Sequence, residues 1–245
     1  MGEKNVNNLE VLEATPGGRN LTYAMLDRLG RAIVTGLYDQ TTFPTEADLA
    51  TEYGVSRSVV REAVKMLGAK GLLTARPRKG TTVQPSRSWN LFDADVLHWL
   101  LERKFSLELL RQFTELRMAI EPAGAALAAR YASETALASI LAGYHRMEAA
   151  EAGDDDPLDA DIAFHVAVLQ ASGNPFYAQF RDVVSTALRT SIRFTNRFVG
   201  RTASLPHHYA VFVAIEQKQE AAATAAMEQL IVDVMALIDA AEKGG

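Results

Sequence analysis

The sequence predicts a mainly α-helical protein in two parts, with three short helices and a small β-hairpin at the N-terminus and an all-α antiparallel helical bundle at the C-terminus. Apolar residues recur at helical spacing along most of the chain, and strand-like segments occur only between residues 72 and 83. Glycine and proline divide the later helical pattern into separate segments. The length of 245 residues, 48% of them apolar, fits two packed domains.

The N-terminal elements begin after a polar stretch. Residues 1–19 end in a Pro-Gly-Gly run, which predicts a flexible leader. The first helix follows, with Gly36 near its end. Its apolar residues at helical spacing are Leu26, Leu29, Ile33 and Leu37. Thr45, followed three residues later by Asp48, is typical of a capping box and opens a second helix.

A third helix follows a turn at Gly54, with Ser56 as its N-cap. The apolar stripe that it buries consists of Val60, Val64 and Leu67. Two short strands at 72–75 and 81–83 come next, joined by a turn. Three short helices and a two-stranded wing over residues 20–84 predict a winged helix-turn-helix.

Residues 85–94 are interpreted as a linker because they begin with Pro85 and contain two serines. From Asp93 onward every periodic segment is helical, so residues 95–243 predict the bundle. The expected helices are 93–103, 106–131, 133–151, 157–172, 175–198, 205–217 and 219–242. Three aromatic residues near the linker either transmit a signal between the domains or only form core between them: Trp89, Phe92 and Trp99.

Positive charge is concentrated in one part of an otherwise acidic chain. Between Tyr53 and Arg87 eight basic residues stand against one acid, whereas the whole chain has a net charge of −5. A basic region on an acidic chain is typical of a module that binds a polyanion. On the third helix Arg57, Ser58 and Arg61 would lie opposite the buried stripe, where side chains can enter a DNA major groove.

The wing adds Arg78 and Lys79, which would contact the flanking DNA backbone without selecting a sequence. The simpler alternative is that these basic residues form only a solvated surface. Their coincidence with a helix-turn-helix and a wing favours DNA binding.

A carboxylate and two imidazoles are expected to converge inside the bundle. Asp161 and His165, four residues apart, project together from one helix, and His208 shares a face with apolar residues on another. Such side chains suit a divalent ion such as zinc, nickel or manganese. Arg117 lies on the apolar side of its helix, where a buried guanidinium needs an anion such as the carboxylate of a ligand.

Each of these residues also has a simpler interpretation. His165 and Asp161 could be hydrogen-bonded partners in the core, and Arg117 could pair with Glu121 one turn further on. A metal-dependent hydrolase or isomerase is the rival function. The sequence lacks His-Glu-x-x-His, Gly-x-Ser-x-Gly and phosphate-loop motifs, which favours a protein that is not an enzyme.

Composition excludes further classes of protein. Without cysteine, disulfides and thiolate metal sites are ruled out. No apolar run reaches about 18 residues, the length that spans a bilayer, and the N-terminus does not resemble a signal peptide. A cytoplasmic protein without a membrane partner is expected.

Four stretches resemble the N-terminal domain of GntR-family transcription regulators. They are Phe43-Pro44-Thr45-Glu46, the run from Tyr53 to Ala63, Lys70-Gly71-Leu72-Leu73, and Arg78-Lys79-Gly80-Thr81. The resemblance implies binding to double-stranded operator DNA. The contacts that it implies are Ser56, Arg57, Ser58, Arg61 and, at the tip of the wing, Gly80. Ala47 stands where many relatives carry an arginine, so the operator preference should differ from the commonest one.

The second half resembles the helical effector domain (FCD) of the FadR subfamily. The stretches that carry this resemblance are Glu115–Pro122, Asp161–His165, Asn174-Pro175 and His208–Ile215. By this resemblance Asp161, His165 and His208 bind a metal, and Arg117 holds the carboxylate of an effector. A further histidine of the family is replaced here by Leu230, which leaves three protein ligands.

Residues 89–102 and 167–170 are similar to galactonate-responsive repressors of sugar-acid catabolism. This similarity implies a homodimeric repressor that an aldonate such as galactonate releases from a pseudo-palindromic operator. Arg189 and Asn196 are further candidates for contacts with the effector. An organic acid, an amino acid and an acyl thioester are the alternative effectors.

Overall fold

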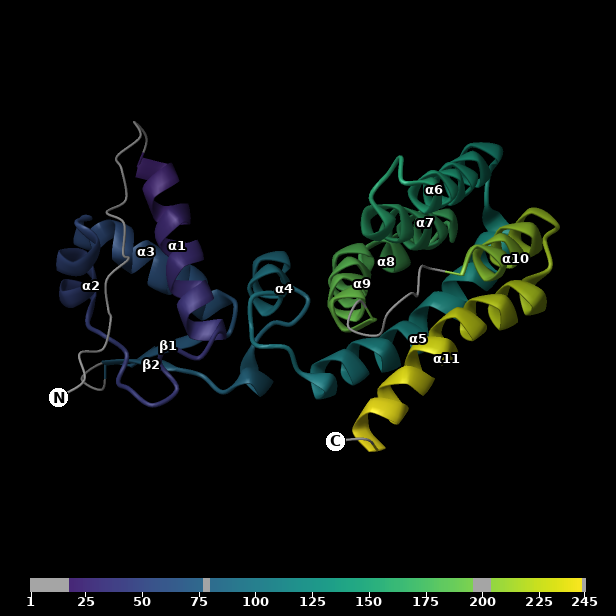
Figure 1. The fold of residues 1–245 in the computed structure, drawn as a ribbon. Coiled ribbons are helices and arrows are strands. Elements are labelled where there is room, and N and C mark those ends of the chain that lie inside the picture. The colour runs from purple at the N-terminus through teal and green to yellow at the C-terminus, as the bar shows by residue number, and fades with distance from the viewer. Residues whose placement is uncertain (1–17, 77–79, 196–203, 244–245) are drawn as a thin grey trace. The chain divides into compact units, whose positions relative to one another are not determined.

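The computed structural model describes residues 18–76, 80–195 and 204–243, and it divides into two compact units between Lys104 and Phe105 (Figure 1). Most of the predicted leader, the wing residues Arg78 and Lys79, and Asn196 lie outside the described residues. Helix α1 begins at Gly18, so the predicted leader ends earlier than residue 19.

The N-terminal unit combines helices with a two-stranded sheet. Its first helices are α1 (Gly18–Val34), α2 (Glu46–Tyr53) and α3 (Arg57–Ala69). Strand β1 (Leu73–Arg76) pairs with β2 (Gly80–Val83) in antiparallel register, with Leu73 opposite Val83. The predicted winged helix-turn-helix fold is therefore confirmed, with strand ends displaced by one residue.

Side chains at the helix ends fix the turn between α2 and α3. The Oγ1 of Thr45 accepts from the amide of Asp48, and the Asp48 carboxylate accepts from the amide of Thr45, both at 3.2 Å. The predicted capping box is thus present. Gly54 has a φ of 64°, which glycine adopts without steric strain. Ser56 caps α3 by accepting from the amide of Val59.

The apolar stripe of α3 is buried as predicted, and α3 packs against α1. The buried residues of the two stripes are Leu26, Leu29, Ile33, Val60, Val64 and Leu67. Leu37 does not continue the stripe of the first helix and is 64% exposed. The reason is that α1 ends at Val34 and the chain turns at Gly36, where φ is 89°.

Residues 85–104 belong to the N-terminal unit, which differs from the predicted linker at 85–94. A short 3-10 helix, η1 (Ser86–Ser88), leads to α4 (Ala94–Leu100), which packs against α1. Trp99 is 1% exposed, and its Nε1 donates to the Asp27 carboxylate at 2.7 Å. Trp99 therefore belongs to the core of this unit, which corrects its interpretation as an interdomain residue.

A glycine on α1 makes room for this tryptophan, and replacing it should destabilise the unit. A Cβ at Gly30 would overlap the Trp99 ring. We expect Gly30→Ala to lower the free energy of unfolding by about 1–3 kcal/mol, the usual cost of overpacking. Urea denaturation measures this difference. The matched control is Gly68→Ala, whose Cβ would meet only the Leu73 carbonyl at 3.6 Å. Equal stability of the two variants would contradict the role of Gly30.

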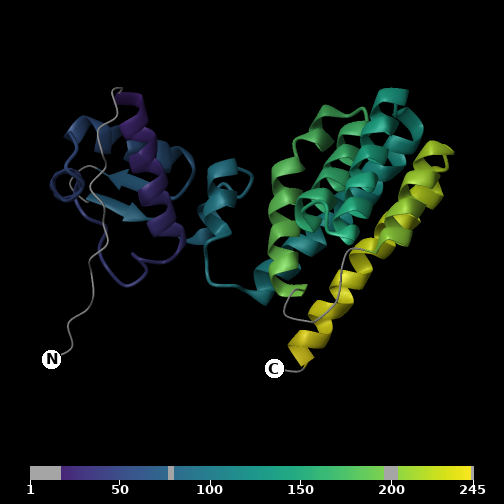
Figure 2. The ribbon, with the colours of Figure 1, turned by 45° about the horizontal axis from the view of Figure 1, so that its top comes forward.

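The C-terminal unit is entirely helical in its described residues. Its helices are α5 (Leu107–Tyr131), α6 (Glu134–Ala152), α7 (Pro157–Ala171), α8 (Pro175–Ala178), α9 (Arg181–Thr195), α10 (Leu205–Glu216) and α11 (Glu220–Lys243). Helix α5 packs against α7, α9, α10 and α11. Figures 1 and 2 show α5 and α11 side by side and running in opposite directions. The predicted antiparallel bundle is confirmed.

One predicted helix, 175–198, is wrong because the chain turns within it. Helix α8 ends at Ala178, and the amides of Gln179 and Phe180 bond to carbonyls three residues earlier instead of four. The amide of Val184 bonds to the Phe180 carbonyl and opens α9. Phe180 packs beside the buried cluster of Ile120, Leu169, Val184 and Leu188. The helical pattern is thus interrupted at a residue whose aromatic side chain packs against the core.

Helix α11 is more apolar than the sequence patterns indicated. An 18-residue window of it has a mean hydropathy of 1.6, so by length and composition it could cross a membrane. It packs against α5 and α10, and 28% of this window is buried inside the structure, so one helix of this kind does not by itself indicate a membrane protein.

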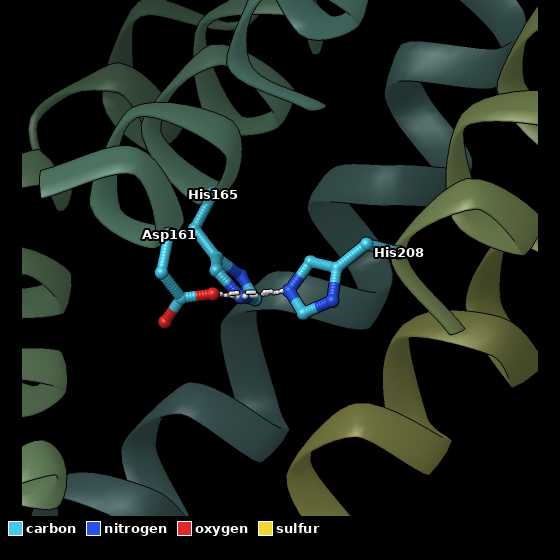
Figure 3. A group of neighbouring side chains, drawn as sticks. All are labelled: Asp161, His165 and His208. Carbon is cyan, nitrogen blue, oxygen red and sulfur yellow. Dashed lines mark hydrogen bonds and ion pairs between the residues drawn. The ribbon is translucent and has the colours of Figure 1, made fainter. Parts of the chain in front are cut away.

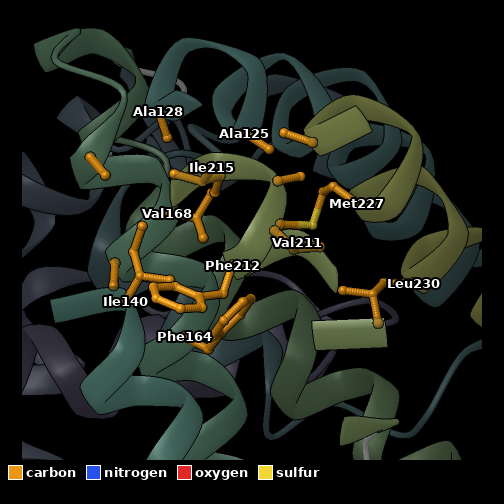
Figure 4. Close-up of a cluster of buried hydrophobic side chains, with 14 of the residues drawn as sticks. Ala125, Ala128, Ile140, Phe164, Val168, Val211, Phe212, Ile215, Met227 and Leu230 are labelled. Atoms are coloured by element: carbon orange, nitrogen blue, oxygen red, sulfur yellow. The ribbon is translucent and has the colours of Figure 1, made fainter. Parts of the chain in front are cut away.

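The main core of the unit lies among α5, α6, α7, α10 and α11 (Figure 4). Phe164 of α7 and Phe212 of α10 lie within it, and both are nearly inaccessible to solvent. This apolar cluster borders the polar group described next, because the Phe164 ring contacts the rings of His165 and His208.

Candidate nucleic-acid interface and candidate metal centre

The polar side of α3 carries the residues predicted to contact DNA. They are Ser56, Arg57, Ser58 and Arg61, all exposed, and they lie at the N-terminal end of the helix. Arg57 and Arg61 are one turn apart and share a face. A helix N-terminus also attracts phosphate through its unpaired amides. The structure thus presents these side chains as the prediction requires, and their contact with DNA stays a prediction.

The wing continues this surface only in part within the described residues. Gly80 is exposed, has a φ of 79°, and has open space where a Cβ would lie. Arg76 is its partner across the strands and is also exposed. Arg78 and Lys79 lie outside the described residues, so their role is not tested.

Asp161, His165 and His208 meet inside the C-terminal unit (Figure 3). Asp161 and His165 lie one turn apart on α7, and His208 comes from α10. Their exposed fractions are 6%, 2% and 3%. One potential ligand atom from each lies within 4.8 Å of the others. The structure therefore brings together the three residues that the sequence analysis selected.

Each histidine has one ring nitrogen bound to an acceptor. Nδ1 of His165 is 2.5 Å from Oε2 of Glu121, and Nδ1 of His208 is 2.9 Å from the Ser204 carbonyl oxygen. An ionised carboxylate and a carbonyl can only accept, so both Nδ1 atoms carry a proton. In the neutral rings, both Nε2 atoms consequently present a lone pair.

These lone pairs and a carboxylate oxygen face one another. The Nε2 atoms of His165 and His208 are 3.4 Å apart, and Oδ1 of Asp161 lies 3.0 Å from Nε2 of His208. Oδ1 of Asp161 is buried and, with both Nε2 atoms unprotonated, has no hydrogen-bond donor among the described residues. Three electron-rich atoms in one buried place fit a cation. Two imidazole nitrogens and a carboxylate oxygen are a donor set that suits zinc, nickel or manganese.

Arg117 lies beside this group and is bound by a neighbour on its own helix. It is 3% exposed, and its Nε donates to Oε1 of Glu121 at 2.5 Å. Of the two interpretations of Arg117, the structure contains the internal pair with Glu121. Glu121 also accepts from His165, so it links the arginine to the histidine.

The charges of this network hold both buried carboxyls in the ionised form. Burial raises the pKa of Glu121, but Arg117 and His165 outweigh burial and lower it to about 2. Burial likewise raises the pKa of Asp161, and the nearby His208, His165 and Arg117 together lower it below its usual value. The group therefore presents an ionised Asp161 to any cation bound there.

Other predicted residues do not belong to the triad or lie outside the described chain. Arg189 is 41% exposed at its side chain and donates to Asp159 at 2.9 Å, so its contact with an effector stays a prediction. Asn196 is outside the described residues. Leu230 is 9% exposed and packs in the same apolar cluster as Phe164 (Figure 4).

The sequence analysis did not identify the contact that Glu121 makes with His165 in this centre. Glu121 was considered only as a partner for Arg117, whereas it also fixes the ring of His165, 44 residues away. Its position on the buried face of α5 was visible from the helical spacing. Its partner on α7 could be found only from the packing of the two helices.

A winged helix-turn-helix with exposed arginines, joined to a helical domain with a buried Asp/His/His group that could hold a metal ion, defines a DNA-binding regulator with a ligand domain. Comparisons with known proteins agree. Residues 24–83 match the model of bacterial regulatory proteins of the gntR family, and residues 112–233 match the FCD domain. The chain belongs to the GntR family and carries an FCD domain.

Two relatives from Escherichia coli strain K12 span nearly the same length. The galactonate operon transcriptional repressor is 35% identical over 86% of this chain and 94% of its own. The HTH-type transcriptional regulator YieP is 32% identical over 87% and 93%. Both matching domains and both relatives are those of transcription regulators. The interpretation that the chain is not an enzyme is therefore confirmed.

Solved structures support the fold. The Listeria monocytogenes regulator Lar matches with a TM-score of 0.56 at 16% identity, over 92% of this chain and 98% of its own. Escherichia coli McbR/YncC matches with a TM-score of 0.51, also at 16% identity, over 91% and 98%. At this identity the likeness concerns the fold alone.

Proposed function

We propose that the protein is a cytoplasmic homodimeric repressor of sugar-acid catabolism that releases its operator when a small carboxylate binds the FCD domain. The effector is an aldonate similar to galactonate. This choice is supported by the 35% identity to the galactonate operon repressor over most of both chains. A dimer would place one winged module on each half of a pseudo-palindromic operator.

On the DNA side, Arg57, Ser58 and Arg61 would read base edges in the major groove while Ser56 and the wing contact phosphates. Gly80 would let the backbone of the wing tip approach the duplex closely. Arg78 and Lys79 would add charge there. Because phosphate contacts dominate affinity, binding should weaken steeply as salt is raised.

On the effector side, the observation that carries the proposal is the buried group of Asp161, His165 and His208 next to Arg117. These three residues would hold the metal, which supplies a Lewis acid for carboxylate and hydroxyl oxygens. Three protein ligands leave room for oxygen atoms of water or effector. Arg117, Arg189 and Asn196 are the proposed contacts for the rest of the molecule.

Thermal denaturation tests the effector. After treatment with a chelator, the protein is mixed with Zn²⁺, Ni²⁺ or Mn²⁺ and then with galactonate, gluconate, amino acids or an acyl thioester. An aldonate at 100 times its Kd should stabilise the chain by about 2.7 kcal/mol, and the same addition after chelation should stabilise it less. If an amino acid or an acyl thioester stabilises the protein and no aldonate does, the proposed effector class is wrong.

Binding to duplexes selected from a random pool tests the DNA half. Arg57→Ala should weaken binding about 5- to 150-fold, the value of one bidentate base contact, and keep the aldonate response. Arg87→Ala is the control, since it removes another exposed arginine, which lies on η1. If both variants lose the same affinity, Arg57 acts only through its charge.

A further inference from the structure

Arg61 touches an acidic residue from another helix. Its Nε donates to Oε2 of Glu46 at 3.4 Å. Glu46 is the first residue of α2, and Arg61 lies on the face of α3 that is predicted to read DNA. Both side chains are accessible, 57% for Arg61 and 37% for Glu46. A duplex that approaches α3 would therefore meet both of them.

The start of α2 fixes the position of this carboxylate. The capping box engages the Asp48 side chain with both the amide and the hydroxyl of Thr45. Glu46 takes no part in the box and reaches across to Arg61 instead. The next residue is Ala47, whose uncharged side chain cannot pair with the Glu46 carboxylate.

A carboxylate on this surface works against affinity for DNA. Phosphates repel it, and the exposed pair itself contributes little to folding stability. A gain in selectivity would explain its presence there. With Nε held by Glu46, the two terminal nitrogens of Arg61 remain as the fork that matches O6 and N7 of guanine. Among the described residues, no other acceptor binds this guanidinium.

We propose that Glu46 is a positioning residue that holds Arg61 in the orientation for reading guanine. The inference rests on the proposed DNA-binding function. It predicts that Glu46 lowers overall affinity for DNA and raises discrimination at the one base pair that Arg61 reads. A merely structural role at the N-terminus of α2 would change stability and leave discrimination as it is.

The test uses the full chain and duplexes selected from a random-sequence pool. Arg61→Ala first identifies the base pair at which selectivity disappears. Affinity is then measured for the selected duplex and for one with that pair replaced. The parent ratio should lie between about 5 and 150. Glu46→Gln should bind the replaced duplex more tightly and reduce the ratio at least threefold.

Two further variants separate position from charge. Glu62→Gln is the matched control, since Glu62 lies on α3 and pairs with Lys65 at 2.8 Å. It should tighten binding to both duplexes equally. Glu46→Asp keeps the charge but shortens the reach, so it should lower the ratio without tightening binding. In the Arg61→Ala background, adding Glu46→Gln should leave the ratio of the two duplex affinities unchanged.

The outcomes distinguish this inference from the function on which it rests. If Glu46→Gln behaves like Glu62→Gln, or keeps the parent ratio, Glu46 does not position Arg61. If Arg61→Ala loses no base preference while the parent selects a sequence, the inference fails and the proposed function stands. If the parent selects no sequence from the pool, both fail.

Discussion

Arg117→Ala should lower the free energy of unfolding by about 3–5 kcal/mol at pH 7, the usual effect of removing one partner of a buried ion pair. Glu121 would remain 1% exposed with its charge facing only His165. Desolvation of a carboxylate that has lost its nearest cation is the physical cause. Urea denaturation with a spectroscopic readout measures the loss.

Two variants test this explanation. Adding Glu121→Gln to Arg117→Ala removes the unpaired buried charge. The double variant should therefore be more stable than the sum of the two single effects predicts. Arg189→Ala breaks the exposed pair with Asp159 and should change stability by 1 kcal/mol or less. If Arg117→Ala and Arg189→Ala were equally stable, Arg117 would not be held as a buried ion.

The same expectation changes how an effector experiment on Arg117 must be designed. A destabilised alanine variant could lose its effector response for structural reasons alone. Arg117→Lys keeps the positive charge near Glu121 but cannot make a two-pronged contact with a carboxylate. A stable lysine variant that binds operator and ignores the aldonate would therefore support a direct contact between Arg117 and the effector.

Local signals predicted the parts of the fold that depend on neighbouring residues. The Thr45–Asp48 capping box, the turn at Gly54 and the N-cap at Ser56 each act over a few positions, so their residue types reveal them. Apolar spacing likewise identified the buried faces. For the same reason, Asp161 and His165 could be paired from the sequence, since they lie one turn apart.

Contacts between distant segments could not be found in this way. The Trp99 ring fits against Gly30 on another helix, which moves residues 85–104 into the N-terminal unit. Phe180 packs against a cluster built from α5, α7 and α9, which breaks a helix that its spacing favoured. The bond between Glu121 and His165 also depends on how two helices pack.

His208→Ala should weaken the binding of a divalent metal by more than about 100-fold. The loss of an outer partner alone typically costs about 10- to 100-fold in metal affinity, and a lost ligand costs more. The measurement is competition with a chromogenic chelator, using Zn²⁺, Ni²⁺ and Mn²⁺ in turn on the parent and the variant. Glu121→Gln should fall between them, since it weakens the orientation of His165.

His207→Ala is the matched control because His207 precedes His208 on α10 but pairs with Asp233 at 3.5 Å, outside the triad. It should bind metal as the parent does. Equal losses in the two histidine variants would place the metal elsewhere. If the parent binds none of the three ions, Asp161, His165 and His208 do not form the proposed metal site. The aldonate would then have to bind without a metal, through Arg117 and neighbouring polar groups.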